Sequence, residues 1–378
     1  MGLLLNEEQR LLRDGALGWL GSAAPVDRFR AMRDAGSTFS ADLWQGACEQ
    51  GYPGIWIQPE HSGAGFGTQG MGVLAQAMGR NLSPLPLVSS ALICPMLIER
   101  LGTEAQKREW LEQFAAGAVR GALAVDEAPH HDVSTTELSA APDGDGHILS
   151  GSKTFVMDGA HAQLLLVAAR TSGASGELDG LSVFLVDPKT PGLSMRPLSA
   201  VDSRDWAGLE LDGVRLGADA LLGASPGSAG AGLEAVLDHA RAVIAAEMLG
   251  MAEELFDRTL EYLRERRQFG SAIGSFQGLQ HRASWMFCEI ELLKSAVHQA
   301  LSALDERSEE AAVLTSLAKS KAGEVLHLIS NEAVQMHGGM GVTDELDLGL
   351  FLKRARTLEM LYGSRHFHAD RFAELSGY

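Results

Sequence analysis

The stretch Arg264–Gln277 combines three arginines, two glutamines, aromatic residues and glycines in one short polar segment. Between two helical patterns, such a segment is ordinarily a polar turn. It also has chemistry that suits a nucleotide. Guanidinium groups donate hydrogen bonds in a fixed fork that matches phosphate oxygens, and an aromatic ring offers a flat face. These residues alone leave both interpretations open.

The composition limits the kinds of partner. At 378 residues the chain has room for two or three domains and a large core. Its formal net charge of −18 argues against nucleic acid and against an anionic membrane surface as partners. A bound anion must therefore be held by a local basic patch, and Arg264–Gln277 is a candidate for that patch.

The cysteines and the N-terminus indicate a cytoplasmic protein. The cysteines are scattered, so we expect small buried thiols in a reduced compartment, and no metal site, at Cys48, Cys94 and Cys288. The chain becomes charged at Glu7, too soon for a signal peptide, and Asn6 makes myristoylation of Gly2 a weak hypothesis. No apolar run is long enough to span a bilayer.

Apolar residues at spacings of three and four predict a helical N-terminal domain, residues 1–118. The expected helices span residues 6–20, 39–50, 68–80, 87–101 and 103–117. Thr38 or Ser40 should cap the second helix, and Thr103 with Gln106 should form a capping box. The glycine-rich loop Gly63–Gly67 follows no strand, so we do not expect a phosphate cradle there.

The pattern changes from Gly121 onward to short apolar runs separated by turns, which predicts a β domain, residues 119–225. Asp143–Gly146 is typical of a hairpin turn within it. The helical period returns over residues 226–378, with helices expected at 229–266, 276–305, 309–337 and 346–374. They should form an antiparallel four-helix bundle. The predicted fold is mainly α with a middle β domain.

Several fragments together are similar to the acyl-CoA dehydrogenase family across essentially the whole chain. Residues 264–277 read Arg-x-Arg-x-Gln-Phe-Gly-x-x-Ile-x-x-Phe-Gln, and residues 335–341 read Gln-x-His-Gly-Gly-x-Gly. The resemblance implies an N-terminal helical domain, a β-barrel-like domain and a C-terminal four-helix bundle, assembled as a dimer of dimers. It also implies FAD as cofactor, an acyl-CoA substrate, and an electron-transfer flavoprotein or similar acceptor.

In this family each flavin lies across a subunit interface, so the resemblance implies a half-site that one subunit donates to the adenosine pyrophosphate of its neighbour's flavin. Glycines there would let the cofactor approach the backbone without a Cβ clash. The residues that the resemblance assigns to cofactor binding are all present: Arg266, Gln268, Phe269, Phe276, Gln277, Gln335, Gly338, Gly339, Gly341 and Ser364.

The segments that face the flavin ring in the family depart from its pattern. Where the family reads Thr-Glu-Pro-x-x-Gly-Ser-Asp, this chain reads Asp126-Glu127-Ala128-Pro129-His130-His131-Asp132. A carboxylate at Asp126 would sit badly beside a reduced, negatively charged flavin. Where the family has a hydroxyl that hydrogen-bonds the ring, this chain has the thioether of Met157, which scarcely can.

The catalytic base is the largest departure. The family removes an α-proton with a glutamate, and the two usual positions hold Tyr362 and Ala240 here. A phenol with its ordinary pKa near 10 is a poor base at neutral pH. Glu247 lies about 10 Å further along the same helix face, and a buried, paired structural role suits it better. Near Tyr362, two arrangements of Arg365, His366 and His368 are open: a titrating cluster, or, as we expect, a solvated or interface-facing helix surface.

Three hypotheses follow. The first is a self-sufficient homotetrameric acyl-CoA dehydrogenase with an atypical base, Tyr362 or Glu247. The second, which we favour, is the base-lacking subunit of an α2β2 acyl-CoA dehydrogenase, like the paired subunits that some bacteria use on bulky thioesters such as steroid side chains. In it a paralogous partner carries the glutamate and the flavin ring. The third is a non-catalytic scaffold that has lost flavin. The sequence does not specify the acyl group.

Overall fold

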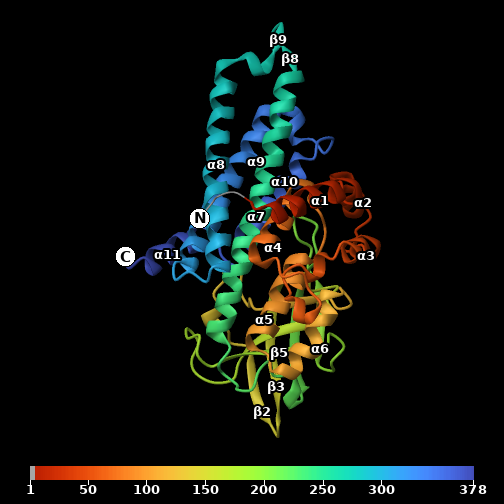
Figure 1. The fold of residues 1–378 in the computed structure, drawn as a ribbon, viewed down its shortest axis with the longest axis vertical. Coiled ribbons are helices and arrows are strands. Elements are labelled where there is room, and N and C mark those ends of the chain that lie inside the picture. Colours follow the sequence, from red (N-terminus) through yellow and green to blue (C-terminus); the bar gives the residue numbers. More distant parts are fainter. Residues whose placement is uncertain (1–4) are drawn as a thin grey trace. The chain divides into compact units, whose positions relative to one another are not determined.

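The computed structural model describes residues 5–378, so the hypothesis about Gly2 lies outside the described residues. The chain divides into two compact units. The bundle unit comprises Met1–Asp34, Thr68–Ser83 and Arg241–Tyr378, and the sheet unit comprises Ala35–Gly67 and Pro84–Ala240. Each unit is described by itself. In Figure 1 the sheet unit includes the yellow and pale-green strands, and the bundle unit includes the long blue and teal helices.

The sheet unit is built on a seven-stranded sheet with the order β1-β4-β2-β3-β7-β6, in which β5 also pairs with β4. The strands β4 and β5 come from two mainly apolar runs of the sequence, and all their residues are buried except Arg170 at the end of β4. The strand β6 was missed because it is short and half-exposed, with no apolar run to mark it. The strands are β1 Gly121–Ala124, β2 Ser139–Asp143, β3 Gly146–Met157, β4 Leu164–Arg170, β5 Leu181–Val186, β6 Leu193–Pro197 and β7 Trp206–Leu216.

The helices of the sheet unit begin where the sequence predicted caps. Ser40 caps α3, and Thr103 forms the expected capping box with Gln106 at the start of α6. The expected helix 87–101 opens with a π-helical turn, Val88–Ile93, before α5. The bounds are α3 Ala41–Glu49, α5 Cys94–Leu101 and α6 Glu104–Ala115, with single 3-10 turns at Tyr52–Gly54, Pro59–His61, Val133–Thr135 and Ala218–Ala220.

The loop Gly63–Gly67 packs on its own segment. A Cβ on Gly63 would lie 1.9 Å from the carbonyl oxygen of Ile57, so this glycine is needed for close backbone packing. That contact gives the loop a structural role.

The bundle unit is centred on α9, which contacts α8, α10 and α11. The helix α4 lies against α7 with backbones in contact, because a Cβ on Gly250 would lie 1.9 Å from the carbonyl oxygen of Gln76. The bounds are α1 Glu7–Ala23, α2 Val26–Asp34, α4 Gly67–Asn81, α7 Gly230–Glu265, α8 Gln277–Asp305, α9 Ala311–His337, the 3-10 turn Gly338–Val342, α10 Leu348–Met360 and α11 Arg365–Leu375.

Two expectations for the bundle unit were wrong. The helix predicted at 346–374 is two helices, α10 and α11, because the chain leaves helical geometry at Tyr362 and Gly363, with φ values of 53° and 114°. The helix α2 was not predicted, since it is polar and buries only Val26 and Phe29.

The cysteines also differ in part from expectation. Cys94 is buried and Cys48 half-buried, but Cys288 is exposed on α8. Among residues 5–378, no helix is long and apolar enough to cross a bilayer. The same residues contain no group of three or more histidine, cysteine, aspartate or glutamate side chains placed to hold a metal ion.

Candidate cofactor half-site and base position

The stretch Arg264–Gln277 forms a β-hairpin that joins α7 to α8. The strands β8, Arg267–Gln268, and β9, Ser271–Ala272, pair across a two-residue turn, and the N–H of Ile273 donates to the carbonyl oxygen of Arg266 at 2.8 Å. Figure 1 shows this hairpin beyond the ends of both helices, at one extremity of the bundle unit. The polar turn of the first interpretation is therefore an ordered, projecting element.

The hairpin presents cations and aromatic rings to solvent. Arg264, Arg266 and Arg267 are exposed, and none of them forms an ion pair with another described residue. The Phe269 side chain is 88% exposed and lies edge-on to Phe276, with 6.1 Å between ring centroids. Unpaired guanidinium groups beside exposed rings fit an anionic diphosphate with a flat base.

The turn residue Phe269 also has a strained backbone. Its φ of 52° is unusual for a bulky side chain, and with Gly270 at 84° it makes a hairpin turn that normally selects asparagine or aspartate at the first position. Such strain, together with an exposed apolar ring, is typical of a segment selected for binding rather than for stability.

The glycine turn at the end of α9 is the second part of the predicted half-site. Gln335, Gly338 and Gly339 are exposed, and a Cβ on either glycine would meet no atom within 4 Å. Open backbone here is what a cofactor diphosphate needs for contact with amide groups. Gly341 is different: it is buried, and a Cβ would lie 2.3 Å from the carbonyl oxygen of Val334, so packing alone requires this glycine.

The base of the hairpin and the glycine turn belong to one surface region. The Tyr262 ring stacks on the His337 ring with 4.2 Å between centroids. Both line a hollow of about 230 Å³ together with Glu265, the last residue of α7. Gln277 is exposed at the start of α8. The exposed arginines and rings of the hairpin and the open backbone at Gly338 and Gly339 fit the adenosine-pyrophosphate part of FAD. The hollow itself does not, because its lining includes the carboxylates Glu261, Glu265, Glu345 and Asp347 with only Arg258 opposite them.

The predicted base position is occupied by a buried tyrosine whose backbone is firmly held. The carbonyl oxygen of Tyr362 accepts a hydrogen bond from Arg241 Nε at 3.0 Å and lies 3.1 Å from His368 Nε2. Ser364, expected to contact the cofactor, caps α11 by accepting from the N–H of Phe367 at 3.3 Å. The turn therefore has a fixed geometry at residue 362 but no carboxylate there.

Lys319, which the sequence gave no reason to single out, completes this arrangement. Its Nζ donates to the carbonyl oxygens of Leu358, Glu359 and Gly363 at 2.9 to 3.0 Å. Burial, and then the nearby Arg241 charge, lower the pKa of Lys319 to about 7. The sequence carries no signal for this role, because all the acceptors are backbone atoms of other elements.

The prediction of an exposed helix surface with two histidines was wrong for His368. His366 is exposed, but His368 is fully buried. Burial and the charges of Lys319 and Arg241 hold the pKa of His368 far below its ordinary value. His368 is thus a neutral packing and hydrogen-bonding group.

The alternative base candidates are accounted for structurally. Glu247 is buried, and its Oε1 accepts from Arg354 Nε at 3.0 Å and Nη2 at 2.9 Å, which is the paired role expected for it. Ala240 is fully buried and offers no titratable group.

In the sheet unit, the segment predicted to face a flavin ring contains a shielded aspartate–histidine contact. Asp126 Oδ1 lies 2.6 Å from His131 Nδ1, and both side chains are largely shielded from solvent. Met157 is buried. Phe155 and Asp158 have φ values of 50° and 58°, so the backbone next to Met157 is strained. The hydroxyl that the family has at the position of Met157 is absent. A carboxylate at Asp126 and a thioether at Met157 therefore stand where the resemblance expects hydroxyl groups.

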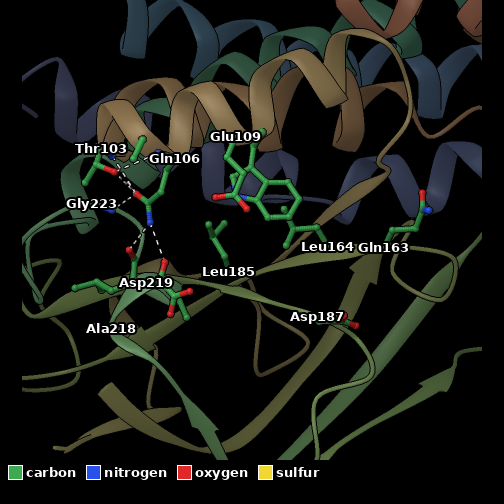
Figure 2. A pocket seen from close by; sticks show the side chains of 14 residues that line it. Thr103, Gln106, Glu109, Gln163, Leu164, Leu185, Asp187, Ala218, Asp219 and Gly223 are labelled. Carbon is green, nitrogen blue, oxygen red and sulfur yellow. Dashed lines mark hydrogen bonds between the residues drawn. The ribbon is translucent and has the colours of Figure 1, made fainter. Parts of the chain in front are cut away.

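A separate hollow of about 390 Å³ lies on the sheet unit (Figure 2). Gln106 is its hydrogen-bonding centre, accepting from the N–H of Gly223 at 3.1 Å. Glu109, Asp187 and Asp219 give it an acidic lining. None of the residues predicted from the sequence to bind cofactor lines it, and its charge does not suit a diphosphate.

A helical domain, a β-sheet domain and a helical bundle, with a cationic hairpin on the bundle, define a flavin-dependent dehydrogenase fold. Three family descriptions match in this order: the acyl-CoA dehydrogenase N-terminal domain over residues 6–118, the middle domain over 125–214, and the C-terminal domain over 231–375. The chain belongs to the acyl-CoA dehydrogenase family. The expected fold is confirmed, while the exact domain boundaries stay a prediction.

Relatives and solved structures agree with this assignment. Acyl-CoA dehydrogenase FadE12 of Mycobacterium tuberculosis is 30% identical over 382 residues, covering 98% of this chain and 96% of the relative. The structure of the Tcur3481–Tcur3483 steroid ACAD is 30% identical, with a TM-score of 0.88 over 98% of both chains. The FAD complex of PigA is 22% identical, with a TM-score of 0.92 over 100% of this chain and 99% of that one, and so shares the fold.

Proposed function

We propose that the chain takes part in the FAD-dependent α,β-dehydrogenation of an acyl-CoA thioester as the subunit that lacks the base. It donates the adenosine-pyrophosphate half-site to a paralogous partner that carries the glutamate and the flavin ring. The observation that carries this proposal is the rigid but base-free turn at Tyr362. It is supported by the commitment of Glu247 to Arg354.

When bound, FAD supplies the acceptor for the hydride that leaves the substrate. In this proposal Arg266 binds the pyrophosphate, and Gln268, Phe269, Phe276 and Gln277 border the same nucleotide. The open backbone at Gly338 and Gly339 approaches the phosphates beside Gln335. Their exposure on a single chain is what a half-site completed by another subunit requires. The roles of Gly341 and Ser364 would be to shape the turns on which they lie.

The segment predicted to face the flavin ring also supports a site that is divided between two subunits. A carboxylate at Asp126 opposes a cofactor that gains negative charge on reduction. The thioether of Met157 cannot replace a hydroxyl donor. The chain would therefore hold no ring of its own, and the partner would supply both ring and base.

The remaining parts of the proposal concern assembly and role. We place the chain in an α2β2 complex in the cytoplasm, passing electrons to an electron-transfer flavoprotein or similar acceptor. The similarity to the Tcur3481–Tcur3483 steroid ACAD, which is described by two components, supports a heteromer that acts in lipid or steroid degradation.

Expression with and without its partner tests the proposal. The chain alone should be colourless or insoluble, whereas co-expression with a paralogous acyl-CoA dehydrogenase subunit should give a yellow complex. Activity of that complex, measured as acyl-CoA-dependent reduction of an electron acceptor, should survive Tyr362→Phe. A yellow, active homo-oligomer that loses activity on Tyr362→Phe would instead establish Tyr362 as the base.

The second candidate is that self-sufficient enzyme, and the fixed position of Tyr362 is the observation in its favour. Glu247→Gln separates the two possible bases, but the Arg354 ion pair gives it a structural cost as well. A scaffold would bind neither FAD nor acyl-CoA, alone or with any partner.

A further inference from the structure

Two carboxylates that follow the glycine turn are held by arginines from other helices. Asp344 receives two parallel hydrogen bonds from Arg33, at 2.8 and 2.7 Å. Asp347 accepts from Arg30 at 2.7 Å and from Arg258 at 2.8 Å. Arg30 also donates to the carbonyl oxygen of Asp344 at 2.7 Å. We call these three arginines and two aspartates the arginine clamp.

The clamp acts on the outgoing end of the glycine turn. Thr343 ties the loop to the turn, since its N–H and Oγ1 both donate to the carbonyl oxygen of Met340, at 3.1 and 2.8 Å. Asp344 comes next in the chain. At the incoming end, Tyr262 stacks on His337 and donates to its carbonyl oxygen at 3.4 Å. The exposed glycines between these two anchors are thus fixed from α2 and from α7.

The clamp also sets the charge beside the turn. The hydrogen bond from Arg33 lowers the pKa of Asp344 to about 2, so this carboxylate is ionised at physiological pH. Two uncompensated carboxylates close to a diphosphate site would repel the ligand. Arg33 also pairs with Asp34 and Arg258 with Glu254, so the three guanidinium groups compensate nearby carboxylates rather than adding a surplus of positive charge.

We propose that Arg30, Arg33 and Arg258 are positioning residues for the cofactor half-site, holding the Gly338–Gly339 backbone in place and neutralising the carboxylates beside it. This inference rests on the proposed function, because it takes that backbone as the contact for the FAD diphosphate. It gives α2, a short N-terminal helix, a role in cofactor affinity.

The test uses the flavin-bearing assembly, stripped of FAD and titrated with FAD while flavin fluorescence is recorded. Arg33→Ala should raise the dissociation constant about fivefold, the effect of losing roughly one well-formed exposed ion pair. Hydrogen exchange measured by mass spectrometry should rise in residues 338–347 and stay unchanged in α9. Arg13→Ala, which removes an exposed arginine paired with Asp14 on α1, is the matched control and should change neither quantity.

A charge-exchange double variant distinguishes the loss of the Arg33–Asp344 ion pair from a general folding defect. Arg33→Asp with Asp344→Arg should recover much of the affinity that either change alone removes, and Arg33→Lys should lie between wild type and Arg33→Ala. Arg266→Ala separates the two proposals. If it leaves FAD affinity unchanged, the half-site itself is wrong; if it weakens affinity while Arg33→Ala does not, only the clamp is wrong.

Discussion

At the scale of single residues, the turn at Tyr362 has a firmly held backbone at the expected position of the catalytic base but no carboxylate there. Lys319, Arg241 and His368 converge on the carbonyl oxygens around Tyr362, and all three side chains are buried. Burying basic groups together is unfavourable unless each finds acceptors, which here are main-chain oxygens. The arrangement keeps residue 362 in its left-handed conformation against its own preference.

Lys319 makes the stability of the protein depend on pH in a defined direction. Its pKa is lowered from 10.5 to about 7, so the unfolded chain binds the proton more tightly between these values. Its unfavourable contribution is therefore greatest below pH 7 and shrinks as the pH rises toward 10. The wild type should gain stability relative to Lys319→Met across this range, as measured by urea unfolding.

The neighbours of Lys319 are Arg241 on α7, Glu359 on α10 and His368 on α11. They remain in both proteins, so their own titrations largely cancel in the comparison. Exposed Lys189 is the control, because Lys189→Met should show no such slope. A stability difference that stays flat from pH 7 to 10 would contradict a buried, titrating Lys319.

At the scale of elements, the sequence predicted the helices and strands whose apolar residues recur at a regular spacing. It missed the features that depend on contacts between residues distant in the chain. The long helices and buried strands follow from apolar periodicity. The break between α10 and α11 does not, because Tyr362 leaves the helix through hydrogen bonds to α7 and α11. The candidate cofactor residues were predicted through a motif, whereas the arginine clamp includes Arg33 and Asp344, which lie about 300 positions apart and have no local signal.

The contact between α4 and α7 provides a test of helix packing. A Cβ on Gly250 would lie 1.9 Å from the carbonyl oxygen of Gln76, so Gly250→Ala must push the two helices apart. The expected loss is on the order of 1–3 kcal/mol of unfolding free energy, seen as a lower thermal midpoint.

Gly18→Ala is the matched control. Gly18 is an exposed residue within α1, and a Cβ there meets no atom within 4 Å. This change should stabilise the protein by up to about 1 kcal/mol, because alanine favours a helix over glycine. Equal effects of the two substitutions would show that α4 and α7 are not in close backbone contact.

At the scale of the whole molecule, a strongly acidic chain concentrates unpaired arginines on one projecting hairpin. The net charge of −18 repels anions in general, so specificity for a diphosphate must come from local geometry. If this chain contributes one half-site and no ring site, its complex should contain one FAD for every two chains. Flavin absorbance against protein concentration measures that ratio, and one FAD per chain would contradict the division of the site between subunits.

The exposed ring of Phe269 has a consequence for the fate of the chain in the cell. Chaperones and proteases act on apolar groups that a finished complex covers. A subunit made in excess keeps this ring, 88% exposed, at the end of a strained turn. In the proposed complex the cofactor would cover Phe269, whereas an unassembled copy would offer this ring to chaperones and proteases. The hairpin would then couple the abundance of this chain to that of its partner.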